Sequence, residues 1–178
     1  MTKNRPYTII PYNSNWPILF SNESKIINDI IGNNILKTHH IGSTSVQGMS
    51  SKSTVDILFI VKDISTINDS ILDMKKIGYT SFGSLNSKNS HLFEKIEDEQ
   101  RTFIIHFYPK GHPEIKQILA IRDYLRSHKD AVGKYSTLKL SLFHKFPNDY
   151  TQYRLLKNEY MNDLKNRAVS WAIDNTNN

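Results

Sequence analysis

The chain has 178 residues, of which 38% are hydrophobic, and its 23 lysines and arginines against 17 acidic residues give a net charge of +6. This composition is too apolar for a disordered chain and suffices for one compact domain. The absence of cysteine excludes a disulfide scaffold, a thiolate zinc site and a cysteine nucleophile. No apolar run approaches the roughly 20 residues that span a bilayer, and the first residues lack the apolar stretch of a signal peptide. We therefore expect a soluble, cytoplasmic protein with no membrane partner.

The predicted elements alternate between helices and strands up to Gly111 and are all helical beyond it. Val55–Val61 is a nearly continuous β-branched apolar run, as expected of an interior strand. After Gly111 the apolar period changes from two to 3.6 residues. In chain order, we predict helix 15–31, strands 35–41 and 55–61, helix 64–77, strands 79–82, 91–96 and 102–108, and helices 113–127, 130–145 and 150–171.

This order predicts an α+β fold, in which a mixed sheet is flanked by helices and the C-terminal helices pack against it. No segment rich in proline, glycine or serine separates the two parts, so we expect a single domain over residues 1–173. We divide it into an α/β part over 1–110 and a basic helical part over 111–173, followed by a frayed polar tail over 174–178.

The positive charge is concentrated in the second part. Residues 1–100 hold ten basic and ten acidic side chains, whereas residues 101–178 hold thirteen basic and seven acidic ones. The whole excess of six indicates an anionic partner such as a nucleotide, a polyphosphate or RNA. The alternative is a solvated helical surface that binds nothing.

Two features near the first strands suggest a metal-binding or phosphate-binding site. Asp56 lies within an apolar strand, where a carboxylate is costly unless it is paired or bound to a metal. The alternative is an aspartate at the strand mouth that caps a loop. Gly42 and Ser43 follow strand 35–41 and enter a turn, where a small residue lets the backbone approach a phosphate and N–H groups and hydroxyls hold it. A Gly-Ser pair alone is common in loops, but its combination with a strand carboxylate thirteen residues later is more specific.

The stretch from His40 to Leu58, HIGSTSVQGMSSKSTVDIL, resembles the signature of the GrpB family of the nucleotidyltransferase superfamily. The resemblance implies a nucleotidyltransferase-like mixed sheet, a Gly-Ser turn that grips a nucleoside triphosphate, and strand carboxylates that hold a divalent metal. It also implies a link to coenzyme A, because this family occurs as a domain attached to dephospho-CoA kinase in some bacteria. The likeness spans Tyr7 to Asn166, and its later segments are Arg101-Thr102 leading to His106, Arg122-Asp123-Tyr124-Leu125-Arg126, and Tyr135, Leu138 and Lys139.

The sequence departs from the superfamily pattern at the metal site. Active nucleotidyltransferases usually carry Asp-x-Asp and a third carboxylate on a neighbouring strand, because paired ions clamp both the attacking and the leaving oxygen. Leu58 holds the second position here, and leucine cannot ligate. His106 stands near the third, where imidazole suits Mn²⁺ or Zn²⁺ better than Mg²⁺, and Ile104 replaces a further histidine of the family. These departures argue against two magnesium ions. His106 has two other readings, as a general base or as a hydrogen-bonded core histidine.

Basic side chains aimed inward from the helices need an anionic partner. At about 100° per residue, Arg122 falls near the middle of the apolar face of helix 113–127, and Lys139 lies at the edge of the stripe of helix 130–145. Arg126 and Lys134 are expected to contribute outer charge. The partner of Arg122 is either an aspartate of the sheet or a ligand phosphate, which a guanidinium binds through two hydrogen bonds.

We therefore predict a protein that binds a nucleotide or another phosphorylated small molecule. Asp56 and His106 would hold one Mg²⁺ or Mn²⁺ and serve a metal-dependent nucleotidyl transfer. A competing interpretation is a non-catalytic nucleotide- or coenzyme-A-related binding module that has lost the second metal carboxylate, and a weaker one is RNA binding by the basic helices. The residues predicted to bind nucleotide or phosphate are Gly42, Ser43, Thr44, Lys52, Arg122, Arg126 and Lys139.

Overall fold

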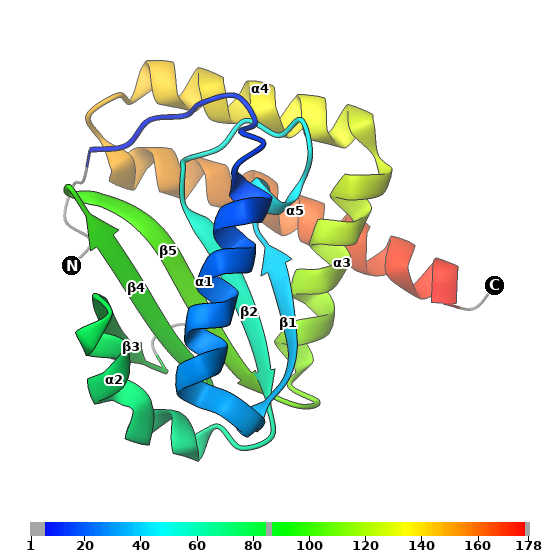
Figure 1. Cartoon of the computed structure of the whole chain (residues 1–178). Helices are drawn as coiled ribbons and strands as arrows, with labels where there is room; N and C mark the ends of the chain where they lie inside the picture. The colour runs from blue at the N-terminus through cyan, green and yellow to red at the C-terminus, as the bar shows by residue number, and fades with distance from the viewer. Residues whose placement is uncertain (1–5, 85–86, 177–178) are drawn as a thin grey trace. The chain divides into compact units, whose positions relative to one another are not determined.

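The computed structural model of the chain describes residues 6–84 and 87–176 (Figure 1). These residues belong to two compact units. The sheet unit comprises residues 14–41, 54–84 and 87–112, and the helical unit comprises residues 6–13, 42–53 and 113–176. The elements are α1 (Trp16–Ile31), η1 (Gly32–Asn34), β1 (Ile35–Ile41), η2 (Ser43–Ser45), β2 (Val55–Val61), η3 (Ser65–Ser70), α2 (Ile71–Lys76), β3 (Tyr79–Gly83), β4 (His91–Glu97), β5 (Gln100–Pro109), α3 (Pro113–Ser127), α4 (Lys129–Lys145) and α5 (Tyr150–Thr176).

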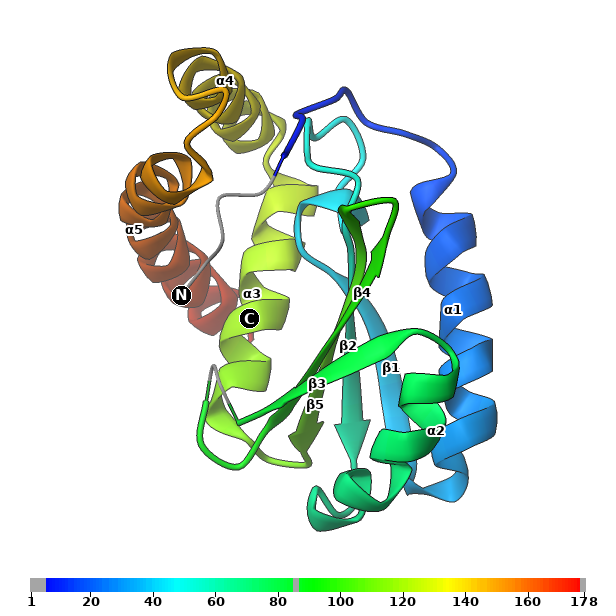
Figure 2. The same cartoon turned by 90° about the vertical axis from the view of Figure 1, so that its left-hand side faces the viewer.

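The sheet unit is built on a five-stranded mixed sheet with the strand order β1-β2-β5-β4-β3. β2 and β5 run parallel, and the other neighbouring pairs are antiparallel. Within this unit α1 and α2 cover one face of the sheet (Figure 2). Every residue of β2 is buried except Asp56, which is half-buried, as expected of a central strand with one polar position. The mixed sheet with its flanking helices confirms the predicted α+β class.

The covered face of the sheet holds a dense aromatic and aliphatic core. Phe59 and Phe107 stack with their ring centroids 5.2 Å apart, and Phe93 meets Phe107 edge to face at 5.9 Å. Ile27 of α1 and Met74 of α2 are fully buried in the same unit. This packing fixes the two central strands, and it thereby fixes the polar side chains that they present on the opposite face.

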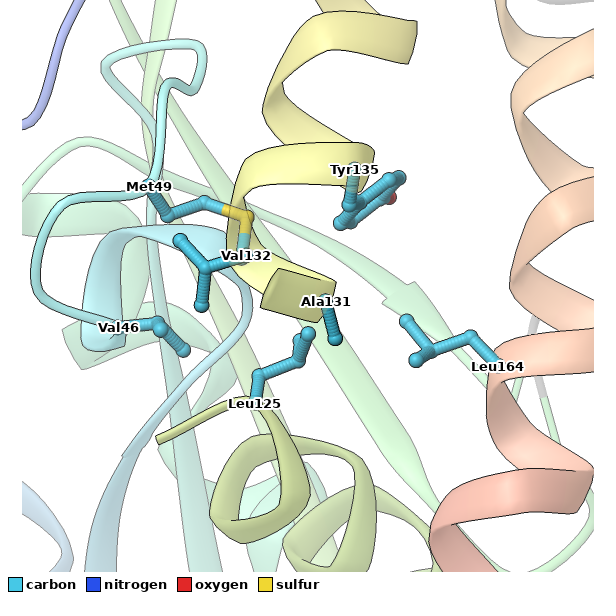
Figure 3. Packing of buried hydrophobic residues seen from close by; sticks show 7 residues of the cluster. All are labelled: Val46, Met49, Leu125, Ala131, Val132, Tyr135 and Leu164. Atoms are coloured by element: carbon cyan, nitrogen blue, oxygen red, sulfur yellow. The ribbon is translucent and has the colours of Figure 1, made fainter. Parts of the chain in front are cut away.

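The helical unit combines α3, α4 and α5 with two connecting segments of the chain. A cluster of buried side chains joins the loop 42–53 to these helices (Figure 3). Ile10 and Ser51 exchange two backbone hydrogen bonds of 2.9 Å, so the segment before α1 is also tied to this loop. The members of the cluster are Val46, Met49, Leu125, Ala131, Val132, Tyr135 and Leu164.

Most predicted bounds agree with the structure to within two residues, but two need correction. The predicted helix 64–77 is a 3₁₀ segment over Ser65–Ser70 and an α-helix only over Ile71–Lys76. Asp63 Oδ1 accepts hydrogen bonds from the amide and the hydroxyl of Ser65, at 2.8 and 2.7 Å, and such local polar bonds compete with a regular helix. α5 runs to Thr176, beyond the predicted end at residue 171 and into the predicted tail 174–178, whose last two residues lie outside the described residues.

The single domain over residues 1–173 stays a prediction. No helix in the described part of the chain combines the length and the hydropathy that crossing a membrane requires.

Candidate functional site

The loop that follows β1 begins at a glycine in the left-handed region. Gly42 has φ 70° and ψ −174°, a conformation that a residue with a Cβ atom adopts only with strain. Its carbonyl oxygen accepts hydrogen bonds from the amide of Ser45 at 3.2 Å and from the Ser45 hydroxyl at 2.7 Å. Glycine at this position therefore permits the tight 3₁₀ turn η2, and it sets the direction in which Ser43 leaves the strand.

Ser43 meets a buried lysine. Lys139 of α4 is 2% exposed, and its Nζ donates to Ser43 Oγ at 3.1 Å while lying 4.4 Å from the centroid of the Tyr135 ring. Within the described residues, no carboxylate lies within ion-pair distance of this amine. Burial, and then the charges of Lys157 and Lys52, lower the pKa of Lys139 to about 7.

Lys52 lies at the other end of the same loop. Its Nζ donates to the hydroxyl of Tyr150 at 2.5 Å and lies 4.3 Å from the centroid of that ring. The loop is also held by the Ser50 amide, which donates to the hydroxyl of Ser136 on α4 at 3.1 Å. The loop and the helices α4 and α5 thus bring the amines of Lys52, Lys139 and Lys157 near enough to influence one another.

The other predicted phosphate ligands already have partners in the protein. The Nε and Nη2 atoms of Arg126 donate to the carbonyl of Ser45 at 3.1 and 2.9 Å, so this arginine supports the loop instead of serving only as outer charge. Arg122 is half-buried, with a side chain 13% exposed, and its Nε and Nη2 donate to Oδ1 and Oδ2 of its neighbour Asp123 at 2.7 and 3.1 Å. Thr44 is fully buried. Phosphate binding by these three residues stays a prediction.

A cavity of about 780 Å³ opens beside this loop within the helical unit. Its size falls in the range of small-molecule sites. Arg126 and Lys129 line it and would favour an anionic or polar ligand. Its other lining residues are Tyr12, Ser45, Gln47, Gly48, Leu125, Val132 and Gly133.

Asp56 and His106 lie together on the sheet unit. Asp56 Oδ1 and His106 Nε2 are 3.6 Å apart, and their side chains are 25% and 17% exposed. In the parallel pairing of β2 with β5, Asp56 is opposite Ile104 and Leu58 is opposite His106, so all four side chains share one face of the sheet. The predicted pairing of a strand carboxylate with this histidine is therefore present in the structure.

This pair can supply two ligands to a divalent ion. A separation of 3.6 Å lets both atoms contact one ion, because bonds of nitrogen and oxygen to such ions are about 2.1 Å long. Among residues 6–84 and 87–176, no group of three or more histidines and carboxylates has metal-site geometry. The donor set suits Mn²⁺ or Zn²⁺ and does not suit a cluster of two Mg²⁺ ions.

The sequence reasoning missed a buried ion pair on the same face. Glu94 of β4 is opposite Ile104 of β5, in the same row as Asp56. Its Oε1 lies 2.7 Å from Nη2 of Arg101, and the two side chains are 9% and 19% exposed. The Nε of Arg101 is buried without a hydrogen-bond acceptor among the described residues. Glu94 lies in an apolar predicted strand, so the argument applied to Asp56 would have found it.

The chain belongs to the GrpB family, because the sequence model of that family, described as GrpB protein, matches residues 6–167. The UPF0157 protein YqkA of Bacillus subtilis is 33% identical over 97% of this chain and 50% of its own length. The UPF0157 protein BH1888 of Halalkalibacterium halodurans is 30% identical over 93% of this chain and 84% of its own. The chain thus spans about half the length of the first of these relatives.

A solved structure shares the fold. The crystal structure of the conserved protein GrpB from Enterococcus faecalis matches with a TM-score of 0.88 and 28% identity, over 93% of this chain and 99% of that one. The resemblance found in residues 40–58 is therefore confirmed at the level of the family and of the fold.

Proposed function

We propose that this protein binds a nucleotide or another phosphorylated small molecule at the loop 42–53. The observation that supports this most strongly is Lys139, a buried amine that has Ser43 as its hydrogen-bond partner and no carboxylate beside it within the described chain. A buried cation is costly unless an anion accompanies it. A phosphate group would supply that anion.

The loop offers donors of the types that phosphates need. Gly42 lets the backbone approach a ligand closely, and the Ser43 hydroxyl, Lys52 and Lys139 can donate to phosphate oxygens. The cavity beside the loop, lined by Tyr12 and Gln47, has room for the rest of the ligand. Arg122, Arg126 and Thr44 would complete the binding groups.

The finer proposal is metal-dependent nucleotidyl transfer, in which an acceptor attacks the α-phosphate in line and pyrophosphate leaves. Asp56 and His106 would hold one Mn²⁺ or Mg²⁺, which when bound neutralises charge on the phosphates. His106 could otherwise take the proton of the acceptor hydroxyl.

A second candidate is a binding module without catalysis, with a ligand related to coenzyme A. Leu58 favours it, because this fully buried leucine holds the position of the second metal carboxylate. Both candidates bind a phosphorylated ligand, but only the first one converts it to a product.

The Asp56→Asn variant separates the two candidates. We expect wild-type protein to release pyrophosphate from a labelled nucleoside triphosphate with Mn²⁺ or Mg²⁺, and the variant to lose at least about 100-fold in rate because the ion loses its charged ligand. Asp73→Asn, which alters an exposed carboxylate on α2, is the matched control and should keep the wild-type rate. Nucleotide binding without turnover under either metal would favour the module, and undetectable binding of all nucleotides would refute both candidates.

The Ser43→Ala and Lys52→Met variants test the phosphate loop directly. Each is expected to weaken nucleoside triphosphate binding by about 10- to 100-fold, because each removes a hydrogen bond to a charged group. Isothermal titration calorimetry measures the change, and Lys134→Met, on the exposed side of α4, should leave the affinity within about twofold. Equal affinities for all four proteins would place the ligand elsewhere.

A further inference from the structure

We propose that ligand binding at the loop 42–53 is coupled to the uptake of one proton by Lys139. The inference rests on the proposed function and adds the pH dependence of the same site. Its basis is the position of the amine, which is 2% exposed, hydrogen-bonded to the hydroxyl of Ser43 and packed against the Tyr135 ring.

The charges that face Lys139 are positive. Lys52 approaches from the loop and Lys157 from α5, and both oppose a third charge on Lys139. Two tyrosines lie beside these amines, since Lys139 Nζ is 4.4 Å from the centroid of the Tyr135 ring on α4 and Lys52 Nζ is 4.3 Å from that of Tyr150 on α5. Because burial and both lysines lower the pKa of Lys139 to about 7, a large part of the unliganded protein carries this amine in its neutral form.

A bound phosphate reverses this balance. Its negative oxygens stabilise the ammonium form and offset the repulsion from the two other lysines. In balanced form, the neutral amine, one proton from solvent and the ligand anion combine to give the ammonium–phosphate complex, with no covalent bond formed. Above pH 7 the free protein lacks this proton and the complex holds it. Affinity must therefore fall as the pH rises, by up to about tenfold per pH unit.

Inorganic triphosphate is the probe for this coupling. At pH 8 its last phosphate oxygen is only partly ionised, so the proton taken up by Lys139 is read from the difference between the wild type and Lys139→Met, in which the contribution of the probe cancels. Isothermal titration calorimetry without metal, in buffers of different ionisation enthalpy, gives the number of protons as the slope of observed enthalpy against buffer enthalpy. We expect the slopes of the wild type and of Lys134→Met to exceed that of Lys139→Met, which binds more weakly, by about 0.9 proton.

The outcomes separate this inference from the proposed function. Binding of triphosphate with equal slopes for the wild type and Lys139→Met would overturn the inference and leave the proposed function in place. If wild-type protein binds no triphosphate at pH 6 or pH 8, both the inference and the phosphate site are wrong.

Discussion

Replacing Lys139 with methionine is expected to raise the free energy of unfolding at pH 7 by about 1–4 kcal/mol. Methionine matches the length of the lysine stem and needs no counter-charge, so it fills the same space between Ser43 and Tyr135 without the cost of a buried amine. Most substitutions of buried residues destabilise a protein, so a gain in stability would be diagnostic.

The predicted gain in the stability of Lys139→Met depends on pH. The pKa of Lys139 is about 7 in the folded chain and 10.5 for an unperturbed lysine, so between these values the unfolded state binds a proton that the folded state lacks. The contribution of Lys139 to the wild-type free energy of unfolding therefore rises as the pH increases from about 7 to about 10.5. Below pH 7 the amine is charged in both states, and the full cost of burying its charge is present. The gain in Lys139→Met should be largest at pH 6 to 7 and shrink toward pH 10.

Urea unfolding at pH 6, 7.5 and 9 measures this difference. Lys134→Met is the control, because its side chain is exposed on the same helix, and it should change stability by less than about 0.5 kcal/mol at each pH. If Lys139→Met is less stable than wild type at pH 7, the amine is not a cost to the fold and the argument for a ligand anion loses its basis. Higher stability combined with weaker triphosphate binding would show that the amine serves the site and not the fold.

Strands and long helices could be predicted from the sequence because local patterns determine them. β1 and β2 have the predicted bounds. For β2 the reason is a nearly continuous apolar run rich in β-branched residues, which admits few other structures, and for β1 it is the Gly-Ser turn that ends the strand. α3 also has its predicted bounds. η3 could not be predicted from periodicity, because the hydrogen bonds of Asp63 to Ser65 are local polar contacts with no apolar signature.

The partners of the site residues were harder to predict than their positions. The helical phase placed Lys139 only at the edge of an apolar stripe, and its hydrogen-bond partner Ser43 lies 96 residues earlier in the chain. Arg126 looked like outer charge because its partner is a backbone carbonyl, that of Ser45, 81 residues away. Composition and spacing do not encode such contacts, whereas the Asp56–His106 pairing followed from the family pattern.

Breaking the pair between Glu94 and Arg101 is expected to destabilise the protein by about 3–5 kcal/mol. The two side chains are 9% and 19% exposed and meet at 2.7 Å, so Glu94→Met leaves a largely buried guanidinium without its counter-charge. Arg101→Met removes the guanidinium beside the Glu94 carboxylate and should also destabilise the protein. The double variant removes both charges and should recover most of the loss, because apolar residues of similar volume replace a buried ion pair at little or no cost.

A double-mutant cycle measured by urea unfolding gives the coupling energy of this pair. The control cycle is Asp73→Ala with Lys76→Ala, an exposed pair whose coupling should stay below about 1 kcal/mol. A similarly small coupling for Glu94 and Arg101 would show that water screens the pair.

The folded double variant also tests whether the pair acts in turnover or only in the fold, because Glu94 lies in the same row of the sheet as Asp56. If it keeps wild-type stability and loses metal-dependent turnover, Glu94 and Arg101 act with Asp56 and His106; if it keeps both, their role is confined to the fold.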